Sequence, residues 1–396
     1  MTDEGATLPV DIYFMGEWWD EHYQKYHGYP AGIDWDWLDA TYLGRQRFLY
    51  EHFGQFGLGQ ERPTLNIPPA EPGQLHPALD YPHVTAVLPF YFFVVPMALG
   101  MHLRIQDVGG YTWDTLTAEE MRRIQPVDIA QTPIREAIVR ERERKLARYG
   151  VAKQMIDLEG PANNAFIMRG PAFYVDLMED QALARHYLEA ITETTCLTYR
   201  FVNQLFGPLD GFFLGNCSVR MISPRMYARM IREYDIRCIE YAAEVTGRPP
   251  LCDLHHCDSD VTRYVEAYSA IPGVRMLQAS YLSDLQQIKR LMPQARFSAM
   301  VNPAGLLSRP AAQVDADLER NLRDGVHDVW LPNVDPGYGP DQVAALLGRL
   351  QQMAARYGRQ ATFTATTFTC EELDFQFARY RGYEEVSLEG LLAGKG

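Results

Sequence analysis

The sequence predicts an α/β protein whose main unit is a (β/α)8 TIM barrel. After residue 80, short apolar or β-branched runs alternate with stretches of helical period, which is the pattern of parallel βαβ units. Eight such runs are present, and eight strands close a TIM barrel, whereas a doubly wound open sheet is the alternative. No G-x-G-x-x-G sequence or phosphate-binding loop follows any run, so nothing supports a dinucleotide or nucleoside triphosphate site.

The first 80 residues differ from the rest and are rich in aromatic residues. We expect residues 1–80 to form a helical or wrapping N-terminal extension and residues 81–396 to form the barrel. Within the extension, a helix is predicted from Ile33 to Phe56. The segment from Glu61 to His83 contains six prolines, and this density of missing N–H donors excludes regular secondary structure.

The predicted strands of the barrel are short and bounded by turn-forming residues. Helices are predicted between them, and three of these end within two residues of a glycine. No hairpin signal separates the strands, which favours parallel pairing. The predicted strands are Val84–Val95, Ala152–Leu158, Asp210–Leu214, Pro250–His255, Val274–Gln278, Ala295–Val301, Asp328–Leu331 and Ala361–Thr366, and the three helices are Met226–Thr246, Pro310–Arg323 and Asp341–Tyr357.

The composition excludes several classes of protein. Charged residues make up 22% of the chain and hydrophobic residues 47%, which excludes a mainly disordered protein. Because 37 Lys and Arg residues face 51 Asp and Glu residues, for a net charge of −14, we expect no nucleic-acid partner. The apolar run Val84–Gly100 contains two prolines and is interpreted as a buried strand and loop, so no membrane association is expected.

The six cysteines are scattered through a large chain whose start, Met1 to Gly5, is unlike a secretory or transit peptide. We therefore expect a reduced, cytoplasmic protein without a disulfide framework. Cys196 and Cys238 fall inside predicted helices and Cys252 on the core side of a strand, whereas Cys370 follows the last predicted strand.

Functional residues of a TIM barrel follow the C-terminal ends of its strands. In this sequence those positions are polar and capable of binding a metal. They are Glu159, Asn216-Cys217, His255-His256-Cys257, Gln278, Asn302, Asn333 to Asp335, and Thr367.

The segment Leu251–Asp260 contains the most informative pattern. Alternate residues of a strand share a face, so His255 and Cys257 are expected to point one way and His256 the other. Imidazole nitrogen and thiolate sulfur are ligands that zinc prefers. The alternative is a hydrogen-bonded core histidine beside a small buried thiol. Cys217, after the preceding strand, is either a further ligand or a buried structural thiol.

Three other residues are candidates for catalysis. Glu159 is a general acid/base or a metal ligand at a strand end, and a contact with a helix terminus is the alternative. Asp335 could bind a metal or orient a substrate, although Asp-Pro-Gly is also an ordinary turn. Asn302 follows the sixth strand of the predicted series and completes this set.

Four segments in this order resemble the uroporphyrinogen decarboxylase superfamily: Gly160–Gly170, Phe212–Ile231, Pro249–Cys257 and Ser298–Pro303. That superfamily includes cobalamin-dependent methyltransferases, which move a methyl group to a thiol. The resemblance covers roughly residues 80 to 350 and implies a TIM barrel, in agreement with the pattern of strands and helices.

The resemblance is closer to the methyltransferase branch than to the true decarboxylases. The decarboxylases carry N-terminal arginines that bind substrate carboxylates, whereas Pro9–Tyr23 contains acidic residues and no arginine. In the methyltransferase branch an H-x-C pair binds zinc, which matches His255 and Cys257. The branch also has a Glu and a Cys as ligands further along, where this sequence has Gln278 and Asp335-Pro336.

The resemblance therefore implies a zinc-dependent methyltransferase, with Cys217, Glu159 or Asp335 completing the ligand set. It would act between a corrinoid (cobalamin) held by a partner protein and a thiol or similar small acceptor. A metal-independent decarboxylase or lyase, in which Glu159, Asp335 and His255 act on a small carboxylated or aromatic substrate, is the second hypothesis. A degenerate, non-catalytic family member is the third. A homodimer is an assembly consistent with each hypothesis.

Overall fold

The computed structural model describes residues 6–23, 35–65, 85–87, 91–105, 111–150, 152–155, 157–257, 259–302, 309–367 and 385–386. Its largest sheet has seven strands in the order β11-β1-β10-β9-β8-β7-β6, and every neighbouring pair is parallel. The predicted α/β class with a parallel sheet is therefore confirmed. The strands are β1 (Thr7–Phe14), β6 (Phe212–Gly215), β7 (Cys252–His255), β8 (Val274–Ser280), β9 (Arg296–Met300), β10 (Asp328–Val334) and β11 (Gln360–Thr366).

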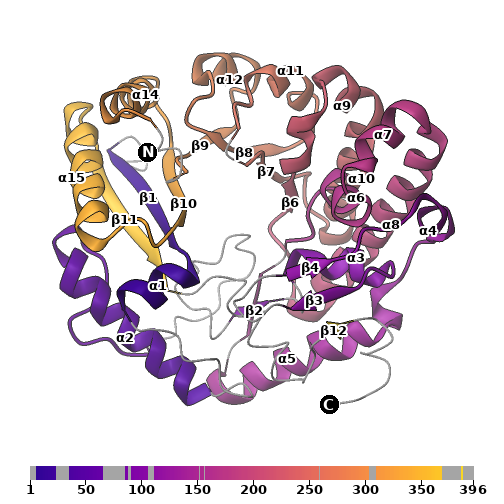
Figure 1. Ribbon diagram of the computed structural model, residues 1–396, viewed down its shortest axis with the longest axis horizontal. Coiled ribbons are helices and arrows are strands. Elements are labelled where there is room, and N and C mark those ends of the chain that lie inside the picture. Colours follow the sequence, from indigo (N-terminus) through magenta and orange to yellow (C-terminus); the bar gives the residue numbers. More distant parts are fainter. Residues whose placement is uncertain are drawn as a thin grey trace.

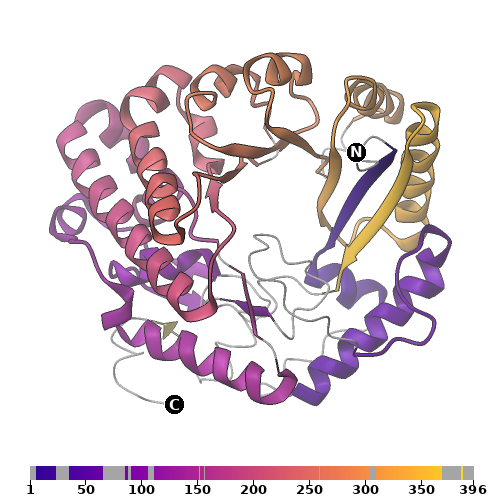
Figure 2. The same cartoon turned by 180° about the vertical axis from the view of Figure 1, so that it is seen from behind.

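The sheet is curved, and the helices that connect its strands lie on its outer side (Figure 1; Figure 2 shows the same arrangement from behind). Each connecting helix returns the chain to the starting edge of the sheet, as parallel pairing requires. These helices are α8 (Gln181–Phe206), α9 (Pro224–Met230), α10 (Arg232–Thr246), α11 (Val265–Tyr268), α12 (Leu285–Leu291), α14 (Ala311–Arg323) and α15 (Pro340–Arg356), with the short 3-10 helices η4 (Cys217–Met221) and η5 (Thr262–Tyr264).

Strand β1 is absent from the predicted strands, yet it lies between β10 and β11 in the sheet. Its alternate residues Leu8, Val10, Ile12 and Phe14 are buried, so period-two alternation was the signal that could have revealed it. The N-terminal segment thus contributes to the main sheet before it continues into helices. The division of the chain at residue 80 stays a prediction.

Two small sheets complete the strand content of the described residues. β2 (Thr85–Val87) pairs in parallel with β5 (Lys153–Met155). β3 (Leu103–Ile105) and β4 (Tyr111–Trp113) form an antiparallel pair, to which β12 (Glu385–Val386) adds. These antiparallel strands lie outside the predicted series, because strands of two or three residues are too short to produce a recognisable alternation.

The predicted helix Ile33–Phe56 appears as α2 (Trp35–Phe53) followed by η1 (Gly54–Phe56). Among the described residues of the predicted run Val84–Val95, only β2 is a strand, and the chain is helical from Tyr91. The predicted helix Met226–Thr246 is divided at Ile231 into α9 and α10. The other helices are α1 (Gly16–His22), η2 (Tyr91–Phe93), α3 (Val94–Ala98), α4 (Ala118–Arg123), η3 (Ile129–Gln131), α5 (Pro133–Tyr149), α6 (Pro161–Arg169) and α7 (Ala172–Glu179).

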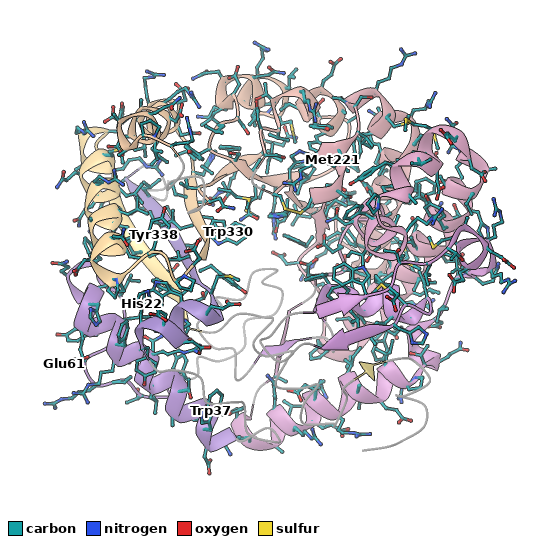
Figure 3. All side chains as sticks on the ribbon, viewed as in Figure 1. His22, Trp37, Glu61, Met221, Trp330 and Tyr338 are labelled. Carbon is teal, nitrogen blue, oxygen red and sulfur yellow. A yellow bond between two sulfur atoms is a disulfide. The ribbon has the colours of Figure 1, made fainter. Side chains whose placement is uncertain are left out.

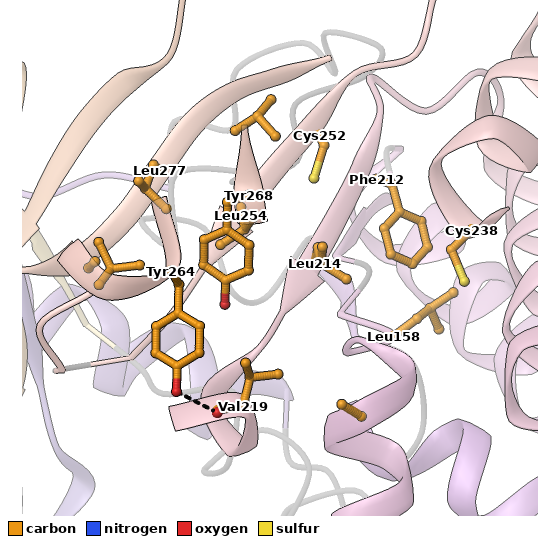
Figure 4. Packing of buried hydrophobic residues seen from close by; sticks show 14 of the residues in the cluster. Leu158, Phe212, Leu214, Val219, Cys238, Cys252, Leu254, Tyr264, Tyr268 and Leu277 are labelled. Atoms are coloured by element: carbon orange, nitrogen blue, oxygen red, sulfur yellow. Dashed lines mark hydrogen bonds between the residues drawn. The ribbon is translucent and has the colours of Figure 1, made fainter. Parts of the chain in front are cut away.

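The hydrophobic core fills the space between the sheet and its outer helices (Figure 4). Phe212, Leu214 and Leu254 project from β6 and β7 toward this core and are almost completely buried. Residues at the alternate positions, such as Phe213 and His255, point to the inner side of the sheet and are partly exposed. Among the described helices, none combines the length and apolar character needed to cross a membrane.

Candidate metal centre

The candidate metal centre lies where strands β6 and β7 end. These parallel neighbours are in register, with Gly215 opposite His255, so the residues that follow them lie at the same edge of the sheet. The ladder continues past the strand ends, because the Asn216 amide donates to the His255 carbonyl over 2.8 Å. The His256 amide likewise donates to the Gln278 carbonyl of β8 over 2.8 Å. These backbone bonds hold the segments that carry the candidate ligands.

Cys217, His255 and Cys257 converge at this edge. Their ligand atoms all lie within 4.8 Å of one another, and each residue is partly exposed. Two thiols and an imidazole match the nitrogen and sulfur donors of protein zinc sites. Three protein ligands with a free coordination position are the arrangement of catalytic zinc. The donor set therefore fits zinc.

The structure joins Cys217 and Cys257 in a disulfide, with their Cα atoms 5.1 Å apart. This bond differs from the expectation of a reduced protein without a disulfide framework, because the two residues follow different strands and meet only through sheet register. Three other described cysteines, Cys196, Cys238 and Cys252, are free and buried, as expected. Since zinc binds thiolates, the disulfide must be reduced before Cys217 and Cys257 can hold a metal.

Backbone strain is concentrated at this edge of the fold. Glu159 (φ 54°) and Cys257 (φ 47°) are the non-glycine residues with positive φ in the part of the chain that the structure describes. This left-handed conformation costs a bulky side chain on the order of 1 kcal/mol or more, and surrounding contacts must maintain it. At Cys257 the turn directs the thiol back toward Cys217 and His255.

His255 is oriented by a side chain on the next strand. Its Nδ1 lies 2.6 Å from Gln278 Oε1, so Nδ1 carries the proton and donates, which leaves Nε2 as the metal ligand. The Phe213 ring stacks against the imidazole at a centroid distance of 5.9 Å, and the Trp330 ring approaches its edge at 5.9 Å. Figure 3 shows Trp330 on the side of β10 that faces the middle of the curved sheet.

His256 points to the opposite side, as strand alternation predicts. It is fully buried and its Nδ1 lies 2.7 Å from the Tyr268 hydroxyl. Burial, followed by the positive charges around it, lowers the pKa of His256 to about 3, so its imidazole is neutral. His256 is therefore a core residue of the helix-facing side of the sheet and not a ligand.

Replacing Gln278 with alanine is expected to weaken zinc binding by about 10- to 100-fold, because His255 loses the acceptor that fixes its tautomer and ring orientation. Competition between the reduced protein and a chromophoric chelator would measure this affinity. Gln351→Ala, an exposed change on α15, is the matched control. Equal zinc affinities for the Gln278→Ala variant and the wild type would contradict this role.

The other predicted catalytic residues do not join the cluster in the part of the chain that the structure describes. Among the described residues, neither Glu159 nor Asp335 joins the group of converging ligand atoms. Asp335 Oδ1 accepts from the Gly337 amide over 2.7 Å, which is the turn contact of an Asp-Pro-Gly segment. Asn302 follows β9 and is partly buried. The side chain of Asn333 and the whole of Cys370 lie outside the described residues. The proposed catalytic roles of Glu159, Asp335 and Asn302 stay predictions.

The pKa of the Glu159 carboxyl is nevertheless strongly perturbed. It follows β5, and its Oε2 accepts a hydrogen bond from Asn163 Nδ2 over 2.7 Å. Burial raises the pKa of the Glu159 carboxyl well above its usual range, and the Asp157 charge raises it further. The hydrogen bond from Asn163 opposes these effects by lowering the pKa. Its carboxyl therefore keeps its proton to a higher pH than an exposed glutamate does.

A buried acid behind the cluster escaped the sequence reasoning. Asp235 on α10 is completely buried, and its Oδ2 accepts from Asn216 Nδ2 over 3.0 Å and from the Tyr227 hydroxyl over 2.7 Å. The signal was present, because Asp235 shares a helical stripe with the buried residues Cys238, Ile239 and Ala242. A carboxylate on an apolar stripe indicates a buried polar partner. Here that partner is Asn216, the residue before Cys217.

Comparisons with known proteins bear on the family. No curated protein matches the chain significantly. A solved structure of a methyltransferase from Methanosarcina mazei aligns with a TM-score of 0.48 at 16% identity, over 69% of this chain and 83% of that chain. The sequence profile named uroporphyrinogen decarboxylase (URO-D) matches residues 70–335, which is more than half of the chain and includes all three residues of the cluster. The chain therefore belongs to the uroporphyrinogen decarboxylase (URO-D) family.

Proposed function

We propose that this protein is a zinc-dependent methyltransferase that moves a methyl group between a corrinoid on a partner protein and a small thiol acceptor. The observation that carries the proposal is the convergence of Cys217, His255 and Cys257 at one edge of the sheet. We also propose that the seven-stranded sheet, together with β2 and β5, forms the wall of a TIM barrel, which places this cluster at the end where such barrels hold their active sites.

The chemistry of the donor set suits thiol activation. Zinc, when bound, would favour the thiolate form of an acceptor thiol, which is the nucleophile that methyl transfer to sulfur requires. Cys217, Cys257 and His255 Nε2 would hold the ion and leave one position for the acceptor. Phe213 and Trp330 contact His255 and would give the acceptor an apolar aromatic wall that excludes water.

The N-terminal segment argues against a polycarboxylate substrate. Pro9–Tyr23 continues from β1 through α1, and it contains Asp11, Glu17 and Asp20 but no arginine. Negative charge repels a substrate with many carboxylates and provides no bidentate partner for them. A decarboxylation of such a substrate therefore lacks support from this segment.

The test is the metal content and activity of the reduced protein beside Cys257→Ala. We expect about one zinc per wild-type chain and little in the variant, because catalytic zinc needs three protein ligands. Methyl transfer from methylcobalamin to a small thiol should fall by at least about 100-fold in the variant, as the ion that activates the thiol is lost. Cys252→Ala removes a buried thiol from the helix-facing side of β7 and should keep its zinc.

Full methyl transfer by Cys257→Ala, or by wild-type protein after complete chelation, would exclude the zinc mechanism. The second candidate is then a metal-independent decarboxylase or lyase. The perturbed carboxyl of Glu159 is the observation that favours it, since a carboxyl with a raised pKa at a strand end can act as a general acid. Decarboxylation of a small carboxylated substrate that survives chelation and is lost in Glu159→Gln would support that candidate.

A further inference from the structure

The loop that begins with Cys217 is held by a side chain from another element. Ser218 follows Cys217 in η4, and its backbone N–H donates to Asn163 Oδ1 over 2.7 Å. This N–H belongs to the peptide group directly after Cys217, so the bond fixes the plane of that group. Asn163 lies on α6 and is 6% exposed, which keeps the bond away from competing water.

The side-chain amide of Asn163 also makes a second hydrogen bond, through its nitrogen atom. Asn163 Nδ2 donates to Glu159 Oε2 over 2.7 Å, so oxygen and nitrogen of one side chain connect Glu159 to the peptide group after Cys217. Because Nδ2 is the donor and Oδ1 the acceptor, the contact with Glu159 also decides which way the Asn163 amide faces. A flipped amide would place its NH2 group against the Ser218 N–H and break the contact with η4.

Two glycines allow this connection. A Cβ atom at Gly215 would lie within covalent distance of Glu159 Oε2, so only glycine leaves room for the carboxyl above the end of β6. A Cβ atom at Gly160 would lie 2.7 Å from the Gly215 carbonyl oxygen. The Gly160 amide donates to that same oxygen over 2.9 Å, which joins the segment after β5 to β6. Glu159 reaches this position with a left-handed backbone, an unfavourable conformation that the surrounding contacts maintain.

We propose that Asn163 and Glu159 are positioning residues of the metal centre: Asn163 fixes the peptide group that follows Cys217, and Glu159 fixes the orientation of Asn163. Neither residue is a ligand in this role. The inference rests on the metal-binding part of the proposed function. It predicts that metal affinity and sulfur coordination depend on two side chains that touch no ligand atom.

The test is metal binding by reduced Asn163→Ala, read as zinc affinity and as the absorption spectrum of the cobalt-substituted protein. Thiolate-to-cobalt charge-transfer bands report how many sulfur atoms bind, which a loss of general stability would not change. We expect zinc affinity to fall by about 10- to 100-fold and the thiolate bands to weaken, as for the loss of an orienting partner. Glu159→Ala should show the same change to a smaller extent.

Glu159→Gln is the rescue variant, because a glutamine oxygen can still accept from Asn163 Nδ2. It should bind zinc and cobalt like the wild type, and it keeps the inference testable if Asn163→Ala does not fold. Asn203→Ala is the matched control, since Asn203 Oδ1 accepts from the Leu209 amide just after α8 and is not connected to Glu159 or Ser218 among the described residues.

The outcomes separate the two proposals. Wild-type affinity and an unchanged cobalt spectrum in both Asn163→Ala and Glu159→Ala would overturn this inference and leave the metal site in place. The inference would also be overturned if Glu159→Gln lost metal as strongly as Glu159→Ala. If the reduced wild-type protein bound neither zinc nor cobalt, the proposed function would fail and this inference with it.

Discussion

Oxidation of the reduced, zinc-loaded protein is expected to release nearly all of its zinc and to join Cys217 to Cys257. The structure shows that these two sulfur atoms can bond to each other, and both also belong to the cluster that fits the metal. A sulfur atom in a disulfide is no longer a thiolate and is a poor zinc ligand, so bond formation leaves His255 as the sole donor of the three. The two states of the centre therefore exclude each other.

Hydrogen peroxide is a suitable oxidant, because the two zinc-bound thiolates give up two electrons, and the peroxide takes these with two protons from the solvent to form two water molecules. Zinc release, followed with a chromophoric chelator, should match the formation of one disulfide mapped by mass spectrometry. Dithiothreitol with added zinc should restore the site. Cys196→Ala should behave like the wild type, because Cys196 is buried on α8 and does not belong to the cluster of converging ligand atoms. Zinc that stays bound after the disulfide has formed would contradict this view of the centre.

Much of the fold follows from local patterns in the sequence. The buried parallel strands β6 to β10 read as short apolar runs with polar residues after them, and the predicted strands at these places are confirmed. Strand β1 was missed because the aromatic residues that follow it suggested a separate extension, whereas its pairing with β10 and β11 is a contact between distant parts of the chain. Such non-local pairing leaves only a weak local signal.

The sequence also predicts part of the candidate site, namely the features that depend on local side-chain direction. Strand alternation correctly separates His255 and Cys257 from His256, because side-chain direction is a local property. That Cys217 joins them depends on the register of β6 against β7, which the sequence does not state. The supporting contacts of Gln278, Asn163 and Asp235 each cross between elements, so residue type alone could suggest polarity but not the partner.

Asp235→Asn is expected to remove a pH-dependent loss of stability that the wild-type protein shows between about pH 4 and pH 7. Burial raises the pKa of Asp235 to about 7, and the hydrogen bonds from Asn216 and Tyr227 only partly offset this effect. The folded protein thus keeps a proton that the unfolded chain has already released. Stability from this group is complete below the unfolded pKa and is lost as the pH rises through the folded value. At about 1.4 kcal/mol per pKa unit, the loss is on the order of 4 kcal/mol.

Asparagine is a close mimic of the protonated acid, because its oxygen can accept the hydrogen bonds of Asn216 and Tyr227 and its NH2 group takes the place of Oδ1. That Oδ1 atom has no hydrogen-bond partner among the described residues, so the exchange breaks no contact. Urea unfolding of both proteins from pH 4 to pH 8, under reducing conditions, should give similar free energies at pH 4 and an increasing advantage for Asp235→Asn toward pH 8. Asp341→Asn, at an exposed site in the first turn of α15, should keep the wild-type pH dependence. Parallel pH profiles for Asp235→Asn and the wild type would show that the buried carboxyl does not govern this loss.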